Sequence, residues 1–200
     1  MFFKTLSEGK TYFNSLKARV RGMTVQTPSK ADILIDIIKS RRTIRSFEDR
    51  EVPKEVIERI LEVARWSPSG SNAQEWRFVV VTDKKLLKAL RMFSPGWLGE
   101  APVVIAVCAD REWAYKVAGK LGRDRMYLID SGIVIQSIVL LAHALGLGTN
   151  IIASFSPEAI RELLNIPDSW DVVALIAMGY PKEVPKAPPR LPLDKLVIWR

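Results

Sequence analysis

The sequence has almost none of the side chains from which cysteine- or histidine-based sites are built. Its 200 residues include one cysteine, Cys108, and one histidine, His143. A single cysteine excludes an internal disulfide, and the two residues together exclude a metal site made of several cysteine and histidine ligands. Cys108 lies in an apolar run and is expected to be an inert small hydrophobe, which fits a reducing compartment such as the cytoplasm. His143 also lies in an apolar stretch and is expected to be a hydrogen-bonded core residue.

Glycine-rich nucleotide motifs and a membrane span are also missing. No G-x-G-x-x-G follows an expected strand and there is no P-loop, so nothing indicates a classical dinucleotide domain. The longest apolar run, residues 132–147, is shorter than the ~20 residues needed to cross a bilayer and is expected to be a buried helix. The first residues lack the unbroken apolar core of a signal peptide.

The chain has an excess of positive charge, but the excess is local. Its formal net charge is +8. Residues 1–30 carry many lysines and arginines with Glu8 as their acidic residue, and the remainder is mildly basic. Binding to nucleic acid or to an anionic membrane is one interpretation. No nucleic-acid-binding motif follows, so no nucleic-acid partner is expected. Packing of this basic arm on the body is favoured over membrane contact.

Hydrophobic periodicity and turn residues indicate one compact domain in which helices and strands are mixed. Thr27-Pro28 is expected to begin the first helix, and Asp83, Asp110 and Ser156 to cap later ones. Helices are expected at 28–40, 53–66, 83–90, 110–125, 129–145 and 156–166, and strands at 76–82, 102–109, 150–153 and 172–179. A proline-rich tail with an apolar end follows Tyr180. It is expected to pack on its own body or on a partner subunit.

Three arginines and a threonine stand together at the end of the first expected helix: Arg41, Arg42, Thr43 and Arg45. The planar guanidinium group binds phosphate oxygens two at a time, and hydroxyls can complete such a cradle. A solvated charged surface is the alternative, and composition alone favours it.

An ordered series of motifs resembles the nitroreductase family of FMN-dependent oxidoreductases, over roughly residues 31–197. The matching segments are Ser40–Phe47, Val52-Pro53, Ala64–Phe78, Ala101–Ile105, Asp130–Gly132, His143–Gly148, Met178–Pro181 and Arg190 with Pro192-Leu193. The resemblance implies an α+β, three-layer α/β/α fold with a mostly antiparallel central sheet. It also implies a homodimer in which each C-terminal tail adds a strand to the partner subunit. The expected organisation is a basic arm at 1–28, an FMN-binding domain at 29–182 and a dimer-embracing tail at 183–200.

The same resemblance implies the cofactor-binding residues. Arg41, Arg42 and Thr43 match the segment that holds the flavin phosphate and ribityl chain, and Arg45 matches a basic position near the pyrimidine edge of the ring. A cation there would stabilise the negative charge of the reduced flavin. Pro68, Ser69, Gly70 and Asn72 match a loop that contacts the partner's flavin. The backbone that faces the flavin N5 is matched by Ile152, Ala153 and Ser154. Arg190 matches a basic residue that returns to the phosphate. No catalytic side chain and no metal is implied.

The implied activity is reduction of nitroaromatics, quinones or flavins by NADH or NADPH, with ping-pong hydride transfer through flavin N5. Other activities of the family remain alternatives: a reductive dehalogenase, a flavin-cleaving enzyme or an azoline dehydrogenase. The chain departs from the family pattern at Glu75, where many members have proline, and residues 91–98 show no clear match for ring contacts. Trp97 is expected either to cover the flavin or to pack in the core.

Overall fold

The computed structural model describes residues 27–200, in two units that divide after Asp36. Most of the predicted arm at residues 1–28 lies outside the described residues. Helix α2 (Lys30–Ser40) begins with a reciprocal cap. The Asp32 N–H donates to Ser29 Oγ, and the Ser29 N–H donates to Asp32 Oδ2, both at 3.1 Å. The predicted cap at Thr27-Pro28 was wrong, because the Asp32 carboxylate selects Ser29 as the capping residue.

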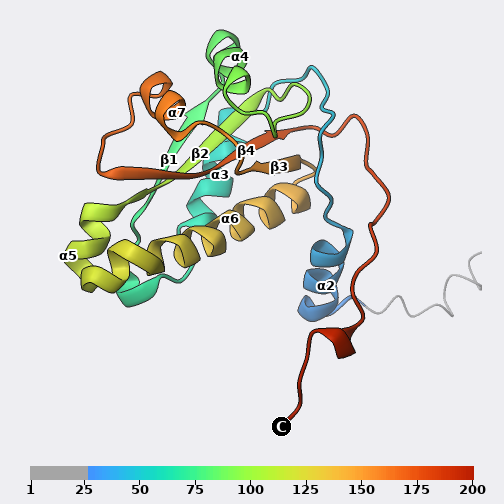
Figure 1. Cartoon of the computed structure of the whole chain (residues 1–200). Helices are drawn as coiled ribbons and strands as arrows, with labels where there is room; N and C mark the ends of the chain where they lie inside the picture. The colour runs from blue at the N-terminus through green and yellow to red at the C-terminus, as the bar shows by residue number, and fades with distance from the viewer. Residues whose placement is uncertain (1–26) are drawn as a thin grey trace, which may run out of the picture. The chain divides into compact units, whose positions relative to one another are not determined.

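The second unit, Ile37–Arg200, is built on a four-stranded antiparallel sheet (Figure 1). Its strands are β1 (Trp76–Val81), β2 (Val103–Asp110), β3 (Gly148–Ile152) and β4 (Trp170–Gly179), in the order β1-β2-β4-β3. Strands β2 and β4 are central, with Ile105 opposite Ile176. Both faces of β2 are covered, which explains why it is an unbroken apolar run in the sequence.

Helices cover both faces of the sheet (Figure 1). On one face, α3 (Lys54–Ala64) and α6 (Tyr127–Ala144) pack against Ile105 and Ile176. On the other, α4 (Lys84–Met92) and α7 (Pro157–Leu163) pack against Val104 and Leu175. Successive residues of a strand face opposite sides, so two separate cores form. The predicted three-layer α/β/α fold is confirmed.

Helix α5 (Arg111–Leu121) leads through the π-helical turn Gly122–Met126 into α6. The combined segment Arg111–Ala144 is long and apolar enough to cross a membrane by length and composition alone. However, Val134, Ile138 and Val139 of α6 lie in the core. The prediction of a buried helix is therefore confirmed.

The C-terminal tail leaves the sheet after an isolated bridge between Phe47 and Pro181. It is extended except for a 3₁₀ turn at Leu193–Lys195. Most large apolar side chains of the tail are exposed, Trp199 by 88%, while Val197 is half-buried. Within the described residues the tail therefore does not bury its apolar side chains on the body of its own chain.

Candidate functional site

The arginine-rich segment after α2 runs beside the outer edge of β3. The Ile44 N–H donates to the Thr149 carbonyl at 2.9 Å, and Thr43 forms a parallel bridge with Thr149. Gly148 permits this approach, because a Cβ at that position would collide with the side chain of Ile44. Just before the segment, Ser40 Oγ lies 2.8 Å from His143 Nε2. The predicted hydrogen bond of His143 is confirmed, but the residue is half-buried and lies outside the two core clusters.

The charges of this segment suit a phosphate-bearing ligand. Arg41, Arg42 and Thr43 are half-buried, and Arg45 is exposed. The Arg42 guanidinium turns back and donates to the carbonyls of Lys39 at 2.7 Å and Arg41 at 2.9 Å. Among residues 27–200, neither Arg41 nor Arg45 pairs with a carboxylate. Guanidinium groups without an acidic partner and one hydroxyl form a donor set that fits the FMN phosphate.

A second segment, Ile152–Ser154 at the end of β3, is connected to the arginine segment by a glycine-containing loop. These three parts together form one wall of the candidate site. A Cβ at Gly96 would collide with the Ser154 hydroxyl, and a Cβ at Gly99 would collide with the Arg45 carbonyl. Gly99 also has a φ of 83°, which favours glycine. The loop therefore packs against both Ser154 and Arg45. The sequence analysis gave a role in this loop to Trp97 and did not predict its contacts with Ser154 and Arg45, although its two glycines were the available signal.

Trp97, within the same loop, is a core residue. It is 4% exposed and belongs to the cluster that contains Leu87 and Leu90. Its indole Nε1 has no hydrogen-bond partner among the residues that the structure describes. Of its two predicted roles, the structure favours core packing.

The loop after α3, residues 67–74, lies at the other end of α6. The Gly70 N–H donates to Asp130 Oδ2 at 2.9 Å, and Ser67 Oγ lies 2.7 Å from Ser137 Oγ. Of the predicted flavin contacts in this loop, Pro68 and Asn72 are exposed, while Ser69 and Gly70 are half-buried. The Asp130 carboxylate that holds this loop was not assigned a role from the sequence, although it stands within a segment that carries the family resemblance.

Glu75, at the end of this loop, is a buried acid beside a second buried acid. Its side chain is 1% exposed, and Oε2 has no hydrogen-bond partner among the described residues. Burial is the main cause that raises the pKa of the Glu75 carboxyl, and the neighbouring Asp130 carboxylate raises it further. A backbone hydrogen bond to the carboxyl lowers the pKa, as does Arg77 more weakly, but burial outweighs both. Glu75 therefore retains a proton to higher pH than an exposed glutamate.

In one chain, the predicted site residues do not all come together. The loop is fixed at Asp130 and the arginine segment at His143, thirteen residues later on the same helix. At ~1.5 Å per residue these anchors are about 20 Å apart along α6. Arg190 is elsewhere again, in the exposed tail, where it contacts the carbonyls of Pro188 and Pro189 at 3.4 Å. The structure thus unites the arginine segment with Ile152–Ser154 but separates both from the 67–74 loop.

Comparisons with known proteins agree on one family. The family model described as "Nitroreductase family" matches residues 38–94 and 91–180. An NADH dehydrogenase of Thermus thermophilus is 33% identical over 189 residues, which cover 80% of this chain and 92% of that protein. An FMN reductase [NAD(P)H] of Bacillus subtilis is 29% identical over 177 residues, covering 80% of this chain and 71% of that protein. The solved structure of an FMN-dependent nitroreductase from Clostridium difficile R20291 has a TM-score of 0.67 and 32% identity, covering 78% of this chain and 91% of that one.

Proposed function

The chain belongs to the nitroreductase family, and on that basis we propose that it is an FMN-dependent oxidoreductase using NADH or NADPH. Its acceptors are nitroaromatics, quinones or flavins. The observation that carries this proposal is the wall formed by the arginine segment, the end of β3 and the loop at residues 96–99. Names of similar proteins support the cofactor and donor, since one is an FMN reductase [NAD(P)H] and another an FMN-dependent nitroreductase.

Each part of this wall has a distinct task in the proposal. Arg41, Arg42 and Thr43 hold the phosphate and the ribityl chain, and their half-buried position strengthens charge-assisted hydrogen bonds. Arg45 places a positive charge at the pyrimidine edge of the ring. The backbone of Ile152–Ser154 offers hydrogen bonds near N5. When bound, FMN supplies hydride chemistry, taking two electrons from NADH or NADPH at N5 and passing them to the acceptor.

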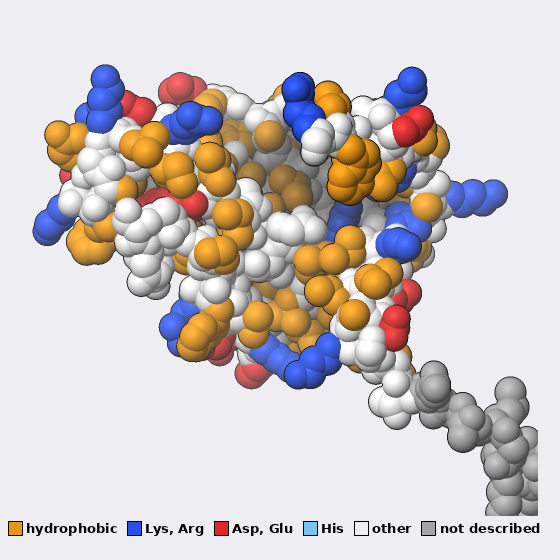
Figure 2. Space-filling view, turned by 90° about the horizontal axis from the view of Figure 1, so that it is seen from below, with side chains coloured by type: hydrophobic (Ala, Val, Ile, Leu, Met, Phe, Trp, Pro, Cys, Tyr) orange, Lys and Arg blue, Asp and Glu red, His pale blue; other side chains and the backbone are white. Residues whose placement is uncertain are grey.

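We propose that the enzyme is a homodimer because one chain carries only part of the site. The loop with Pro68, Ser69, Gly70 and Asn72 lies about 20 Å along α6 from the arginine segment. A second copy in a two-fold arrangement brings its own loop to the first copy's arginines, and the reverse. Hydrophobic side chains are gathered with Lys and Arg on the hollowed face that Figure 2 shows, as expected for a surface that a second copy covers.

The exposed tail has a natural place in such a dimer. The outer edge of β1 has no strand partner among the described residues, whereas the outer edge of β3 already bridges Thr43. A groove of 1280 Å³ touches the C-terminal end of β1 at Val80 and Thr82 and is lined mainly by residues 47–58. An extended tail from the partner can add a strand at this edge, bury its apolar side chains and return Arg190 to the phosphate.

The visible spectrum tests the cofactor, and anaerobic reduction tests the activity. The purified protein, supplied with FMN if necessary, is expected to bind one flavin per chain and to be reduced by NADH or NADPH. Reduction by dithionite but by neither nicotinamide would refute the proposed donor and favour a specialised flavoenzyme of the family. A colourless protein that binds DNA or anionic vesicles in a salt-sensitive manner would refute the flavoenzyme itself. We place the enzyme in the cytoplasm, because a chain with a single cysteine has no internal disulfide and fits a reducing compartment.

A further inference from the structure

The loop after α3 is held in a strained backbone conformation. Ser71, Asn72 and Gln74 have φ angles of 53°, 54° and 49°. These values lie in the left-handed region, which non-glycine residues rarely adopt. Such strain persists only where surrounding contacts hold it, and it is concentrated at binding and catalytic sites. Specific contacts must therefore fix this loop.

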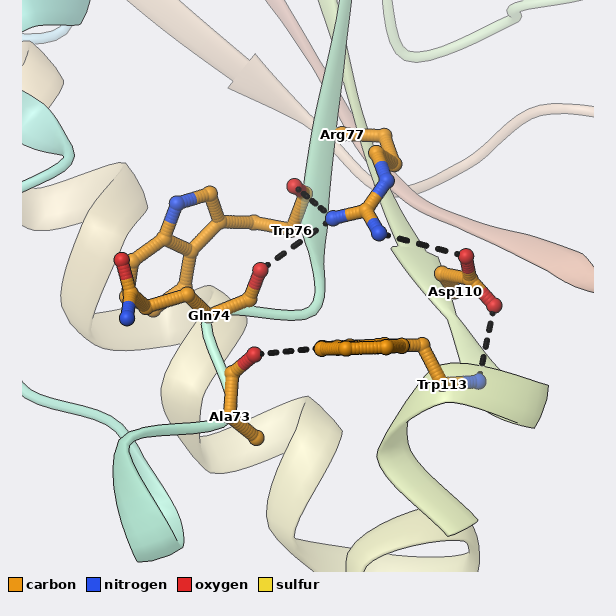
Figure 3. A network of polar contacts seen from close by, with 6 residues as sticks. All are labelled: Ala73, Gln74, Trp76, Arg77, Asp110 and Trp113. Carbon is orange, nitrogen blue, oxygen red and sulfur yellow. Dashed lines mark hydrogen bonds and ion pairs between the residues drawn. The ribbon is translucent and has the colours of Figure 1, made fainter. Parts of the chain in front are cut away.

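Besides Asp130 and Ser137, two further side chains from outside the loop contact it, at its C-terminal end (Figure 3). The indole Nε1–H of Trp113, on α5, donates to the Ala73 carbonyl at 2.7 Å. The guanidinium of Arg77, on β1, donates to the Gln74 carbonyl at 3.1 Å. These two successive carbonyls flank the left-handed residue Gln74. Together the two donors fix the path by which the loop enters β1.

Asp110 joins both donors into one network (Figure 3). Its Oδ1 accepts the backbone N–H of Trp113 at 3.0 Å, and its Oδ2 lies 3.3 Å from Arg77 Nη2. Arg77 also donates to the Trp76 carbonyl at 3.0 Å. The first turn of α5, the start of β1 and the loop are therefore held by one set of contacts. A change in any one of them reaches the loop backbone.

We infer that Trp113 is a positioning residue for the cofactor, holding the 67–74 loop through Ala73 in the conformation that contacts the flavin of the partner subunit. The inference rests on the proposed function, in which this loop completes the partner's FMN site. If the loop adopts the competent conformation only part of the time, the apparent Kd is the intrinsic Kd divided by the fraction of loops in that conformation. The hydrogen bond from Trp113 to Ala73 raises the fraction of loops in the competent conformation, because it offsets the cost of the left-handed backbone. No contact between Trp113 and the flavin is required.

The test is the Trp113→Phe variant of the full-length protein, which keeps an aromatic ring and removes the donor. Titration of the apoprotein with FMN is expected to show about fivefold weaker binding, as one net hydrogen bond would give. Arg77→Lys is a second variant: it keeps the charge beside Asp110 but loses the fork that reaches Gln74, and it should weaken binding similarly. Tyr115→Phe is the matched control on the same helix, since its ring packs against Arg123.

Rescue separates positioning from general destabilisation. Glycine adopts a positive φ without steric cost, so Ser71→Gly should relieve part of the strain. In the Trp113→Phe background it should restore most of the lost affinity, while in the unaltered protein its effect should be small. A variant that binds weakly because its whole fold is loosened would gain nothing from that glycine.

The outcomes are distinct. Unchanged FMN affinity in dimeric Trp113→Phe, or a loss that Ser71→Gly leaves unrepaired, overturns the inference alone. If the tryptophan variant does not fold, unchanged FMN affinity in dimeric Arg77→Lys overturns the inference instead. Absence of FMN binding by the unaltered protein overturns the proposed function and, with it, this inference.

Discussion

The backbone N–H of Gly70 donates to Oδ2 of Asp130 at 2.9 Å, in the first turn of α6. The far end of the same helix carries His143, which lies 2.8 Å from Ser40, immediately before the arginine segment. Helix α6 thus acts as a rigid spacer between the two groups of predicted flavin contacts. Because these two contacts stand thirteen residues apart on α6, we propose that the two groups of one chain belong to different flavin sites.

Complementation between two inactive variants tests the shared site. Arg41→Ala disables the arginine segment, and Pro68→Trp places a bulky side chain in the loop at an exposed position. At an FMN concentration that fills the wild-type protein but lies well below the weakened Kd of each variant, both homodimers are expected to have little activity. Unfolding and refolding the two together should restore about one quarter of the wild-type activity, because half of the dimers are mixed and each has one intact site. A mixture that remains inactive would show that each chain builds its own site.

The two outer arginines of the segment are expected to have different effects. Arg41→Ala should weaken FMN binding by about 1.5–3 kcal/mol, the range for a hydrogen bond to a charged group, or roughly tenfold or more. Arg45→Ala should chiefly lower the reduction potential of the bound flavin, because it removes the cation that stabilises the reduced ring. Fluorescence titration and anaerobic redox titration measure these effects, with the exposed Arg59→Ala as control. Wild-type affinity and potential in both variants would place the site elsewhere.

The buried Glu75 carboxyl predicts a stability that declines with pH. Its pKa in the folded protein is raised above the ordinary value of 4.5, chiefly by burial. The folded state therefore binds this proton more tightly than the unfolded state. Its contribution is fully present below pH 4.5 and is lost as the pH rises through the raised value. Glu75→Gln should flatten this decline. The melting temperature of the variant, compared with that of the unaltered protein, should therefore be higher at pH 8 than at pH 5.

The control for Glu75 is the exposed Glu55 of α3. Glu55→Gln should leave the pH profile of the melting temperature unchanged, since that side chain is in water in both states. A Glu75→Gln protein whose loss of stability grows as the pH rises would contradict the prediction, because it would show that the ionised carboxylate stabilises the fold.

Cys108 should be unreactive in the folded protein. It is 0% exposed in β2, and burial raises the pKa of its thiol to about 12. Because the thiolate is the reactive form, a disulfide reagent at pH 8 should label it only after denaturant is added. The rate of absorbance change on adding the reagent measures this. Rapid labelling of the native protein would mean that the central sheet opens readily.

Removal of residues 183–200 should abolish the dimer and, with it, FMN binding. The deleted tail exposes its apolar residues in a single chain, Trp199 by 88%, so its burial is expected to come from the partner. Light scattering after size exclusion measures the assembly state. Arg190→Ala in the intact chain is the matched variant and should keep the dimer while weakening FMN retention. A truncated protein that remains dimeric and yellow would contradict the proposed role of the tail.

Much of the fold could be predicted because its signals are local. Asp83 and Ser156 cap α4 and α7 as expected, each through a hydrogen bond to a backbone N–H three residues later. The apolar run at residues 102–109 indicated a strand, and the structure has β2 there. Such patterns are determined by neighbours within a few residues, so the sequence alone determines them. The nitroreductase resemblance likewise follows from the order of short motifs.

The assembly of the site depended on contacts between distant residues. Nothing near Ser71 or Gln74 indicates a left-handed backbone, because neither is glycine. That conformation is held by Trp113 and Arg77, and Trp113 lies forty positions after its acceptor Ala73. The sequence by itself predicted which side chains would bind FMN, and it indicated the elements that carry them. Only the tertiary structure decided that α6 keeps the two groups apart, because that separation follows from helix length and packing and not from any local pattern.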